Sequence, residues 1–374
     1  MIDPGRLWAI ARKETLQLRR DTRSLILAFL LPVTLVVLFG YAISWDVENI
    51  QTAVLDQDRS ARSRQLLDAF HASGYFEFVQ VPEDYARGPE ELLDRGAARI
   101  VLVVPPDFSE DLDAERTAEV QALVDGTDAN TATITLGYAR AIVQDYSRSV
   151  RFAGRTVTPP VRSDTRVWYN EELESKNMIV PGLVAVIMMI IAAMLTSLTI
   201  AREWERGTME QLASTPVGRA EVVLGKLLPY VAIGIIDVVL VSVIGVWLFG
   251  VPFRGSAGLL MILSLAFIIG AATLGVFISA VAKSQLLATQ LAMILTFLPA
   301  FLLSGFMYAI EVMPAAREAV TYLIPARYFL VVTRGIFLPG VGGEVLAAQA
   351  VLMIVFAAAG LGLAVLRFRK EIRA

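Results

Sequence analysis

The sequence of 374 residues contains no cysteine and a single histidine, His71. Without cysteine the chain cannot form disulfides, thiolate zinc sites, iron–sulfur clusters or a cysteine nucleophile. It also has no HExxH motif and no second histidine that would complete a serine or zinc hydrolase. We therefore expect no metal or cofactor bound by this chain, and no catalytic role for His71, which falls on the polar flank of a predicted helix.

Charge is also scarce. Only 18% of the residues are charged, against roughly 25% in ordinary soluble domains, and the net charge is −3. The basic residues do not gather on one face, so nothing indicates a nucleic-acid partner. A phosphate-binding loop is missing as well, because the closest string, which ends at Gly225-Lys226, has the wrong glycine spacing and no Ser or Thr after the lysine. We expect that this chain does not hydrolyse nucleotides by itself and is not an enzyme.

Apolar residues dominate instead, at 56% of the chain with a mean hydropathy of +0.60. Six apolar stretches each supply the ~20 residues that a helix needs to cross ~30 Å of hydrocarbon. They are Leu25–Ser44, Met178–Ile200, Val222–Phe249, Gly258–Ala282, Leu286–Phe306 and Leu346–Leu366. The pattern predicts an α-helical polytopic membrane protein with one span at 25–45 and a five-helix domain at 177–374.

The segment 46–176, between the first and second spans, is polar and alternates strand-like with helix-like patterns. Strands are expected at Ile50–Leu55, Tyr75–Val81, Ile100–Val104, Val120–Val124 and Val161–Trp168, and helices at Ser60–Ala72, Pro89–Ala97 and Ala129–Phe152. This order predicts an inserted α/β domain with a mixed sheet.

Two acidic clusters in segment 46–176 could be interpreted as metal sites. Asp56 and Asp58 resemble the beginning of a calcium loop, but no glycine follows Ser60 and Leu67 stands where a bidentate glutamate is needed. A strand-to-helix turn with local caps explains them better. Asp125 and Asp128 are interpreted in the same way.

Lysine and arginine are concentrated in the N-terminal segment, in the link after the second span and in the C-terminal tail. By the positive-inside rule both termini are expected to be cytoplasmic and segment 46–176 extracytoplasmic. All five tryptophans fall at or near predicted span ends, which agrees with this topology.

Residues 1–24 are predicted to form a cytoplasmic helix lying in the membrane interface. Asp3 is a suitable cap, Pro4 suits the first helical position, and the apolar residues share one face: Leu7, Ile10, Ala11 and Leu18. The first span could alternatively be a secretory signal cleaved near Ala42, but the region before it and its apolar run are too long. An uncleaved anchor is favoured.

The link at 202–216 reads as a short amphipathic helix with an apolar ridge of Met209, Leu212 and Ala213, and Pro216 ends it. Such a helix suits a groove on a cytoplasmic partner, whereas an ordinary link at headgroup level would have a similar composition. Composition alone leaves both interpretations open.

The amino-acid sequence of this link closely resembles the signature of type-2 ABC transporter permeases of the multidrug-exporter-like branch. The matching string is Glu203-x-Glu205-x-Gly207-Thr208-x-Glu210-x-Leu212, followed by Thr215-Pro216. The resemblance extends over nearly the whole chain, including Arg12-Lys13-Glu14, Val54 to Ser60, Pro181-Gly182, Leu303 to Phe306 and Arg334 to Phe337.

The resemblance implies the permease of an ATP-driven exporter in a bacterial inner membrane, moving a drug-like or lipid-like substrate out of the cytoplasm or inner leaflet. The expected partners are cytoplasmic ABC ATPase subunits carrying ATP and magnesium, a second identical or homologous permease and the lipid bilayer. Periplasmic adaptor and outer-membrane components are further candidates. The residues expected to couple the ATPase to the spans are Glu203, Glu205, Gly207, Thr208, Glu210 and Leu212.

Two charged residues within the apolar regions are further candidates. Asp237 lies near the middle of the third span, where a carboxylate costs about 2.5–3.5 kcal/mol. It either lines a substrate path or subunit contact, or is neutral and hydrogen-bonded to a neighbouring helix. Arg334 falls in segment 307–346, where we expect short helices that partly re-enter the membrane from outside and form an outer gate.

Other classes of protein fit less well. A receptor with an extracytoplasmic ligand-binding domain would normally carry a cytoplasmic output domain, which this sequence does not show. An ion-driven transporter stays open because Asp237 could carry a proton, although five spans after a domain do not suggest an inverted repeat. An intramembrane enzyme lacks convincing catalytic groups.

Overall fold

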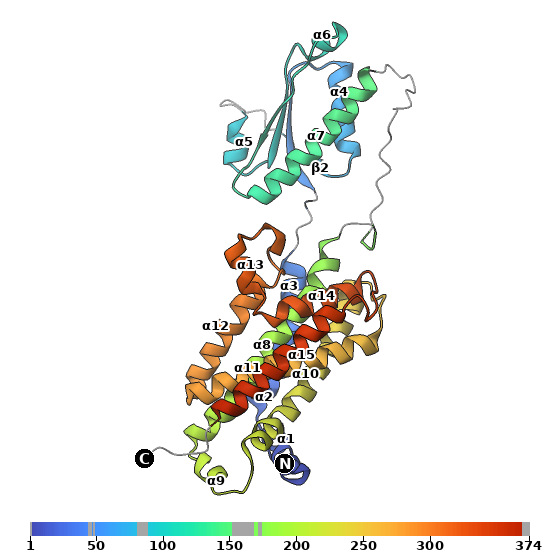
Figure 1. The fold of residues 1–374 in the computed structure, drawn as a ribbon. Coiled ribbons are helices and arrows are strands. Elements are labelled where there is room, and N and C mark those ends of the chain that lie inside the picture. Colours follow the sequence, from blue (N-terminus) through green and yellow to red (C-terminus); the bar gives the residue numbers. More distant parts are fainter. Residues whose placement is uncertain are drawn as a thin grey trace. The chain divides into compact units, whose positions relative to one another are not determined.

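The computed structural model describes residues 2–43, 47, 49–80, 89–151, 168–170 and 174–368. The chain forms two compact units (Figure 1). A helical unit combines Met1–Ser44 with Arg166–Ala374, and a sheet unit comprises Trp45–Thr165.

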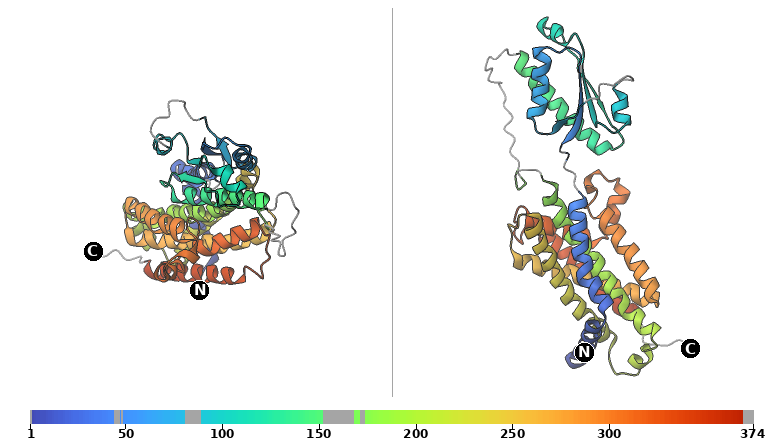
Figure 2. Two further views of the ribbon diagram at one scale, coloured as in Figure 1. Left: turned by 90° about the horizontal axis from the view of Figure 1, so that it is seen from above. Right: turned by 180° about the vertical axis from the view of Figure 1, so that it is seen from behind.

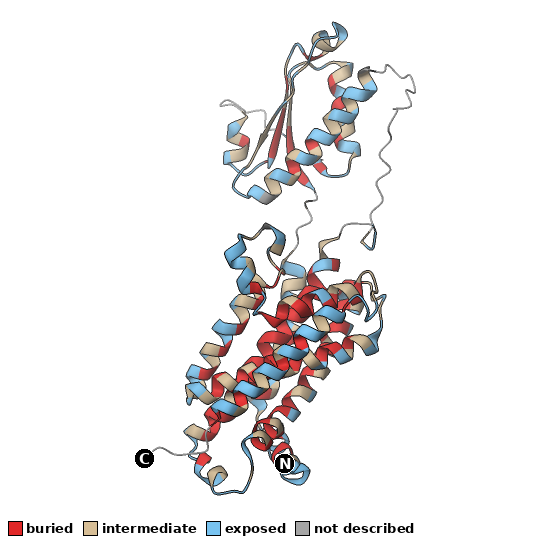
Figure 3. Cartoon of the chain, viewed as in Figure 1, coloured by how far each residue is buried: buried red, intermediate tan, exposed pale blue. Residues whose placement is uncertain are grey.

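Five helices of the helical unit are long and apolar enough to cross a membrane, among the described residues. They are α8 (Ser175–Glu205), α10 (Arg219–Phe249), α11 (Ala257–Ala282), α12 (Gln285–Leu303) and α15 (Ala347–Arg367). Helix α8 lies in the centre (Figure 3). In its apolar stretch of 18 residues, 94% are buried, whereas in the corresponding stretch of α15 only 17% are buried. The predicted polytopic membrane protein is therefore confirmed, and α8 is the element around which the other helices pack.

The first predicted span differs from a single straight helix. It consists of α2 (Thr22–Leu25), a π-helical turn η1 (Ile26–Leu30) and α3 (Leu31–Ala42), and its apolar part, Ile26–Ala42, is shorter than the five spanning helices. The N–H of Leu31 donates to the carbonyl of Ile26, one residue further back than in an α-helix. Pro32, which has no N–H to donate, is the second residue after this turn. Against the predicted six spans, the described residues thus contain five helices that meet the length and apolarity of a span, or up to six if a bent pair of helices further along the chain counts as one.

Between α12 and α15 the chain forms a 3₁₀ turn η2 (Ile310–Val312), α13 (Ala315–Thr321) and α14 (Pro325–Phe337). Helices α13 and α14 meet at 80°, the geometry of a broken span or a re-entrant loop. Pro325 begins α14 at a position where its missing N–H has no cost. One face of α14 is buried, including Phe329, Val332 and Ile336, so this helix is part of the core of the unit.

Helix α1 (Pro4–Arg20) begins as predicted, because Asp3 Oδ1 accepts a hydrogen bond from Gly5 N at 2.8 Å. Ile10, Ala11 and Leu18 of its apolar face are buried. A Cβ on Gly225 of α10 would lie 2.8 Å from Ile10 Cβ, so the absence of a side chain there lets the two helices touch. Helix α1 is therefore packed directly onto the bundle.

The sheet unit contains a mixed four-stranded sheet in the order β2-β1-β3-β4. Strand β1 (Ile50–Asp56) is parallel to β2 (Phe76–Phe78) and β3 (Ile100–Val104), and β4 (Gln121–Val124) is antiparallel to β3. Helices α4 (Ala61–Ala72) and α7 (Ala129–Arg151) cover one face, and α5 (Glu90–Asp94) lies on the other (Figure 2).

The alternation along β3 explains these two layers. Ile100, Leu102 and Val104 join the core beneath α4 and α7, while Val101 joins Leu92 of α5. Helix α6 (Phe108–Asp113) was not predicted from the sequence. The strand expected at Val161–Trp168 lies outside the described residues, apart from Trp168, which is in no strand.

Candidate functional site

Helix α8 ends in a turn whose backbone conformation favours glycine. Gly207 has φ +68°, in the left-handed region, and its N–H donates to the carbonyl of Trp204 at 3.2 Å. A Cβ at Gly207 would meet no atom within 4 Å. The preference for glycine therefore comes from the backbone conformation and not from a lack of room for a side chain. The turn redirects the chain into α9 (Met209–Ala213).

Helix α9 packs its apolar side against the chain's own helices. Met209 is buried in a cluster with Ile10, Ile200 and Val222, and Leu212 lies partly buried against the same cluster. Glu210 and Gln211 are exposed. The apolar ridge predicted for this helix therefore packs largely against the helical unit itself. The exposed polar side of α9 is the surface that a partner could contact.

A buried group of charges lies behind this turn. We define the Lys226 cluster as Lys13, Glu14, Glu203, Thr208 and Lys226. Lys226 Nζ donates to Glu14 Oε1, to Glu203 Oε1 at 3.0 Å and to the carbonyl of Thr199 at 3.4 Å. Lys13 Nζ lies 2.6 Å from Glu203 Oε1, and the hydroxyl of Thr208 donates to Glu203 Oε2.

The Lys226 cluster connects α1, α8 and α10 with Thr208, the residue that precedes α9. Lys226 and Glu14 have side chains only 2% and 3% exposed, and Glu203 is nearly as buried. The Lys13 side chain is 52% exposed, so the charges removed from water are those of Lys226, Glu14 and Glu203, and their ion pairs offset the cost of that burial. Since each charge depends on partners from other helices, none of these helices can shift alone without leaving a buried charge unpaired.

Glu203 does not lie where its side chain could contact another subunit. Its carboxylate points into the Lys226 cluster and has no surface available to a partner. Sequence reasoning did not single out Glu14 or Lys226 as members of a site. The available signals were a carboxylate on the apolar face of the N-terminal helix and a lysine at the beginning of an apolar span.

Glu205 also makes contacts within the chain. Its carboxylate accepts a hydrogen bond from Gln285 N at 2.7 Å and another from the Gln285 side chain, which ties the end of α8 to the beginning of α12. Nearby, Lys283 Nζ lies 4.7 Å from the ring centroid of Trp204. Of the predicted carboxylates, only Glu210 is exposed without a hydrogen bond or ion pair among the described residues.

The beginning of α1 is fastened to the point where the chain enters α10. Glu221 accepts hydrogen bonds from Asp3 N at 2.8 Å and Gly218 N at 2.6 Å, and Arg6 Nη1 donates to the carbonyl of Pro216 at 2.6 Å. Helix α1 therefore contacts both the bundle and the segment that follows α9.

At the other end of α1, Arg202 Nη2 lies 2.9 Å from Asp21 Oδ2, and Ser24 Oγ donates to the same oxygen at 2.7 Å. Burial raises the pKa of Asp21, but the hydrogen bonds from Ser24 and the charge of Arg202 outweigh it, so its pKa lies below the usual value. This pair holds the beginning of the first apolar helix against α8.

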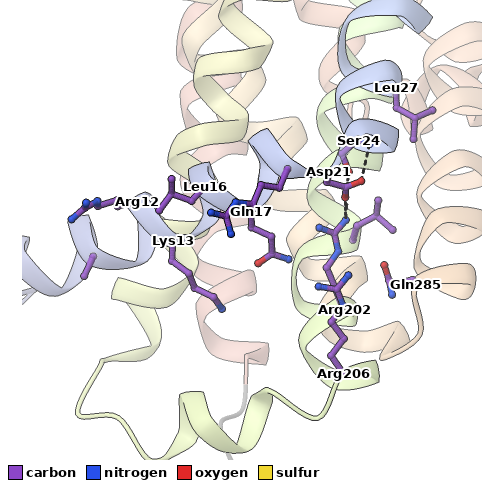
Figure 4. Close-up of a pocket in the computed structure, with 13 residues that line it drawn as sticks. Arg12, Lys13, Leu16, Gln17, Asp21, Ser24, Leu27, Arg202, Arg206 and Gln285 are labelled. Carbon is purple, nitrogen blue, oxygen red and sulfur yellow. Dashed lines mark hydrogen bonds and ion pairs between the residues drawn. The ribbon is translucent and has the colours of Figure 1, made fainter.

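A groove of about 1010 Å³ lies beside this pair (Figure 4). Its walls come from α1, the beginning of the first span, the end of α8 and the beginning of α12. Charged lining residues are Arg12, Lys13, Arg20, Asp21, Arg202 and Arg206. Five of these six side chains are cationic, so the groove is electropositive.

Asp237 lies in the interior of α10 and is 0% exposed. Neither carboxylate oxygen has a hydrogen-bond partner among the described residues. The alternative in which a serine or threonine of another helix satisfies Asp237 is thus wrong for this conformation. Burial inside one subunit also disfavours a direct subunit contact.

Arg334 of α14 links three elements near the beginning of α8. Its Nε donates to the carbonyl of Met178 and its Nη1 to the carbonyl of Gly305, both at 3.3 Å, while Nη2 is buried without a partner among the described residues. The guanidinium therefore holds α14 against α8 and the end of α12.

The acidic turns of the sheet unit have local partners. Asp56 accepts hydrogen bonds from Arg59 N and Ser63 Oγ, and Asp58 accepts from Ser109 Oγ. His71 is exposed, with its ring 5.8 Å from that of Phe78. Within the described ranges no three His, Asp or Glu side chains come close enough to hold a metal.

Comparison with known proteins gives matches over almost the full length. The family model described as "ABC-2 family transporter protein" matches residues 22–366. The chain is 36% identical to "Probable multidrug ABC transporter permease YbhS" of Escherichia coli K12, covering 98% of this chain and 97% of that protein. It is 31% identical to "Probable multidrug ABC transporter permease YbhR" of the same strain, covering 89% and 90%. "Inner membrane transport permease YhhJ" is 28% identical, covering 86% and 85%.

Proposed function

Because this chain belongs to the ABC-2 family of transporter proteins and is a membrane-spanning transporter subunit, we propose that it is the permease of an ATP-driven exporter. A separate cytoplasmic ATPase supplies the energy, and ATP with magnesium binds there. The chain acts as a transport component, without catalytic residues of its own.

The observation that carries this proposal is the connection of α9 to the bundle. Its outer side, with Glu210 and Gln211, is free to contact an ATPase, while Thr208 at its beginning bonds to Glu203 in the Lys226 cluster. A force applied to α9 therefore reaches α1, α8 and α10 through buried charges and the fixed Gly207 turn. In this proposal Glu203, Glu205, Gly207 and Thr208 transmit movement, and Glu210 contacts the motor.

The proposed topology places both termini and α9 in the cytoplasm and the sheet unit on the opposite side, in a bacterial inner membrane. The concentration of basic residues around α1, α9 and the end of α15 supports this orientation. Two permeases, identical or homologous, assemble with two ATPases. Adaptor and outer-membrane components are candidate partners of the sheet unit.

We assign the cargo to hydrophobic or amphipathic compounds, drug-like or lipid-like. The names of the relatives YbhS and YbhR, which specify a multidrug permease, support this class. Asp237 is the residue that we place on the substrate path, because a buried carboxylate without a partner gains most from a substrate's polar or cationic group. Arg334 is placed at an outer gate, where it bonds to two carbonyl groups of α8 and the end of α12.

The test is to purify the chain with its ATPase, reconstitute the complex and compare variants of α9 and its turn. Gly207→Ala, Glu210→Ala and Leu212→Ala should uncouple ATP hydrolysis from transport while leaving the spans folded. Glu344→Ala, which alters an exposed carboxylate in a turn of the same unit, is the control. Unchanged transport and unchanged ATPase stimulation in all three α9 variants would contradict the proposed coupling.

The unpaired Asp237 also favours a second candidate, an ion-driven transporter. The two differ in their energy source. An exporter requires ATP and its ATPase, whereas an ion-driven transporter would accumulate substrate in vesicles with an imposed proton gradient and no nucleotide.

A further inference from the structure

The electropositive groove beside α1 has more positive charge than the chain itself neutralises. Lys13 pairs with Glu203, and Arg202 pairs with Asp21. The remaining three cations of the groove, Arg12, Arg20 and Arg206, have no ion pair within the described part of the chain. An anion from outside the chain would complete the charge balance.

The groove lies where the apolar helices end. It is bounded by the beginning of the first span, the last turn of α8 and Gln285 at the beginning of α12. Since these apolar helices cross the bilayer, their common end lies at the headgroup level of one leaflet. Leu16, Leu27 and Leu198 line the same groove, so its wall changes from cationic to apolar.

This combination specifies the chemistry of the occupant. Guanidinium groups match the oxygens of a phosphate, and basic pockets between spanning helices recognise anionic headgroups. The groove, at about 1010 Å³, is larger than a bare phosphate requires, and its leucines offer nothing to a soluble ion. Ile26 and Leu30 of the adjoining first span are 50% and 58% exposed, so this helix also presents apolar surface for an acyl chain.

We propose that this groove binds the phosphate headgroup of an anionic phospholipid, with the positive charge of Arg12, Arg20 and Arg206 around the headgroup and an acyl chain lying against Leu27 and Leu198. A bound lipid would bridge α1 to the end of α8, next to the Lys226 cluster. The inference rests on the membrane placement of the helices and is independent of the cargo and of ATPase coupling.

The test uses the full chain in nanodiscs containing equal amounts of phosphatidylglycerol and phosphatidylcholine. After extraction into detergent, native mass spectrometry measures which lipid remains bound. The unchanged protein should retain phosphatidylglycerol in preference to phosphatidylcholine. The double variant Arg12→Gln with Arg206→Gln should weaken that retention about thirtyfold, as expected for two lost cations near the surface.

The matched control is Arg19→Gln with Arg219→Gln. Both arginines are exposed, lie at the same end of the helices and do not line the groove, so the loss of net charge is identical. Retention in this control should be unchanged. Equal losses in the two double variants would overturn the proposal, because the effect would then be one of overall charge.

A second arm distinguishes a lipid from a free anion. Inorganic phosphate at millimolar concentration should fail to displace phosphatidylglycerol, because it cannot replace the acyl contacts. Displacement by inorganic phosphate would overturn the lipid assignment, as would equal retention of the two lipids by the unchanged protein. ATPase stimulation is not a readout here, so failure of the exporter assignment would leave this result intact.

Discussion

Helix α10 carries two buried charged residues in very different surroundings. Lys226, near its beginning, has two carboxylates and a carbonyl as partners, whereas Asp237, about three turns further along, has none among the described residues. The end of the helical unit that carries α1 is held together by charges. Its middle is held by close apolar packing that leaves Asp237 unsatisfied. A buried charge with partners stabilises an arrangement of helices, and one without partners indicates a site reserved for something else.

The largest expected effect comes from breaking the charged end. Lys226→Met removes the ammonium between Glu14 and Glu203, which strands Glu14 as a buried, uncompensated charge. The free energy of unfolding should fall by about 3–5 kcal/mol. Unfolding in detergent titrated with sodium dodecyl sulfate measures this change. Lys176→Met, at a more exposed lysine, is the control, and adding Glu14→Gln to Lys226→Met should restore part of the loss.

The apolar middle can be broken without touching any charge. A Cβ on Gly275 of α11 would overlap the carbonyl of Ala193 and the hydroxyl of Thr196 on α8. Gly275→Ala should therefore force the two helices apart and cost about 1–3 kcal/mol in the same assay. Gly362→Ala on α15 is the matched control, because its Cβ would meet no atom within 4 Å. If Gly275→Ala were no more destabilising than this control, the close packing of α8 and α11 would be refuted.

Asp237 should respond in the opposite direction from Lys226. Asp237→Leu removes an unpartnered polar group from the interior and should stabilise the unit by about 1–2 kcal/mol while abolishing transport. For comparison, Thr296→Val removes a buried hydroxyl that has a partner, the carbonyl of Ala292, and should give no such gain. Full transport by Asp237→Leu would exclude Asp237 from the substrate path.

The smallest effect concerns the beginning of α1. Asp3→Ala removes the carboxylate that accepts from Gly5 N, while the bond from Asp3 N to Glu221 stays. Loss of the cap should cost about 1 kcal/mol, visible as a small shift in unfolding. Glu344→Ala, in an exposed turn, should leave stability unchanged. A loss of several kcal/mol in Asp3→Ala would mean that α1 contributes more to the charged end than its cap.

Much of the fold could be predicted from local sequence patterns. The apolar stretches correspond to the spanning helices, and Asp3-Pro4 marks the beginning of α1. Alternation and turn chemistry located β1, β3 and β4 in the sheet unit. These features depend on residues that are neighbours along the chain, so a single sequence contains the necessary information.

The candidate site was harder to predict because its contacts join distant segments. Glu203 was expected among the residues that couple the ATPase to the spans, but its ion pairs with Lys13 and Lys226, far away in sequence, were not predicted. Leu212 belonged to a predicted ridge for a partner and instead lies against a cluster that includes Ile10. The π-helical turn in the first span was also not predicted, since apolar composition does not distinguish such a turn from an α-helix.

The sequence by itself determined that hydrocarbon is the solvent for most of this chain, because length and apolarity decide whether a helix can cross a bilayer. It also supplies a glycine at position 207, and glycine is the residue that adopts a left-handed backbone conformation with the least strain. Only the tertiary structure decided which charges are paired. Pairing depends on distances of about 3 Å between helices that no local pattern records, and those distances separate Lys226, which holds the helices together, from Asp237, which has no partner.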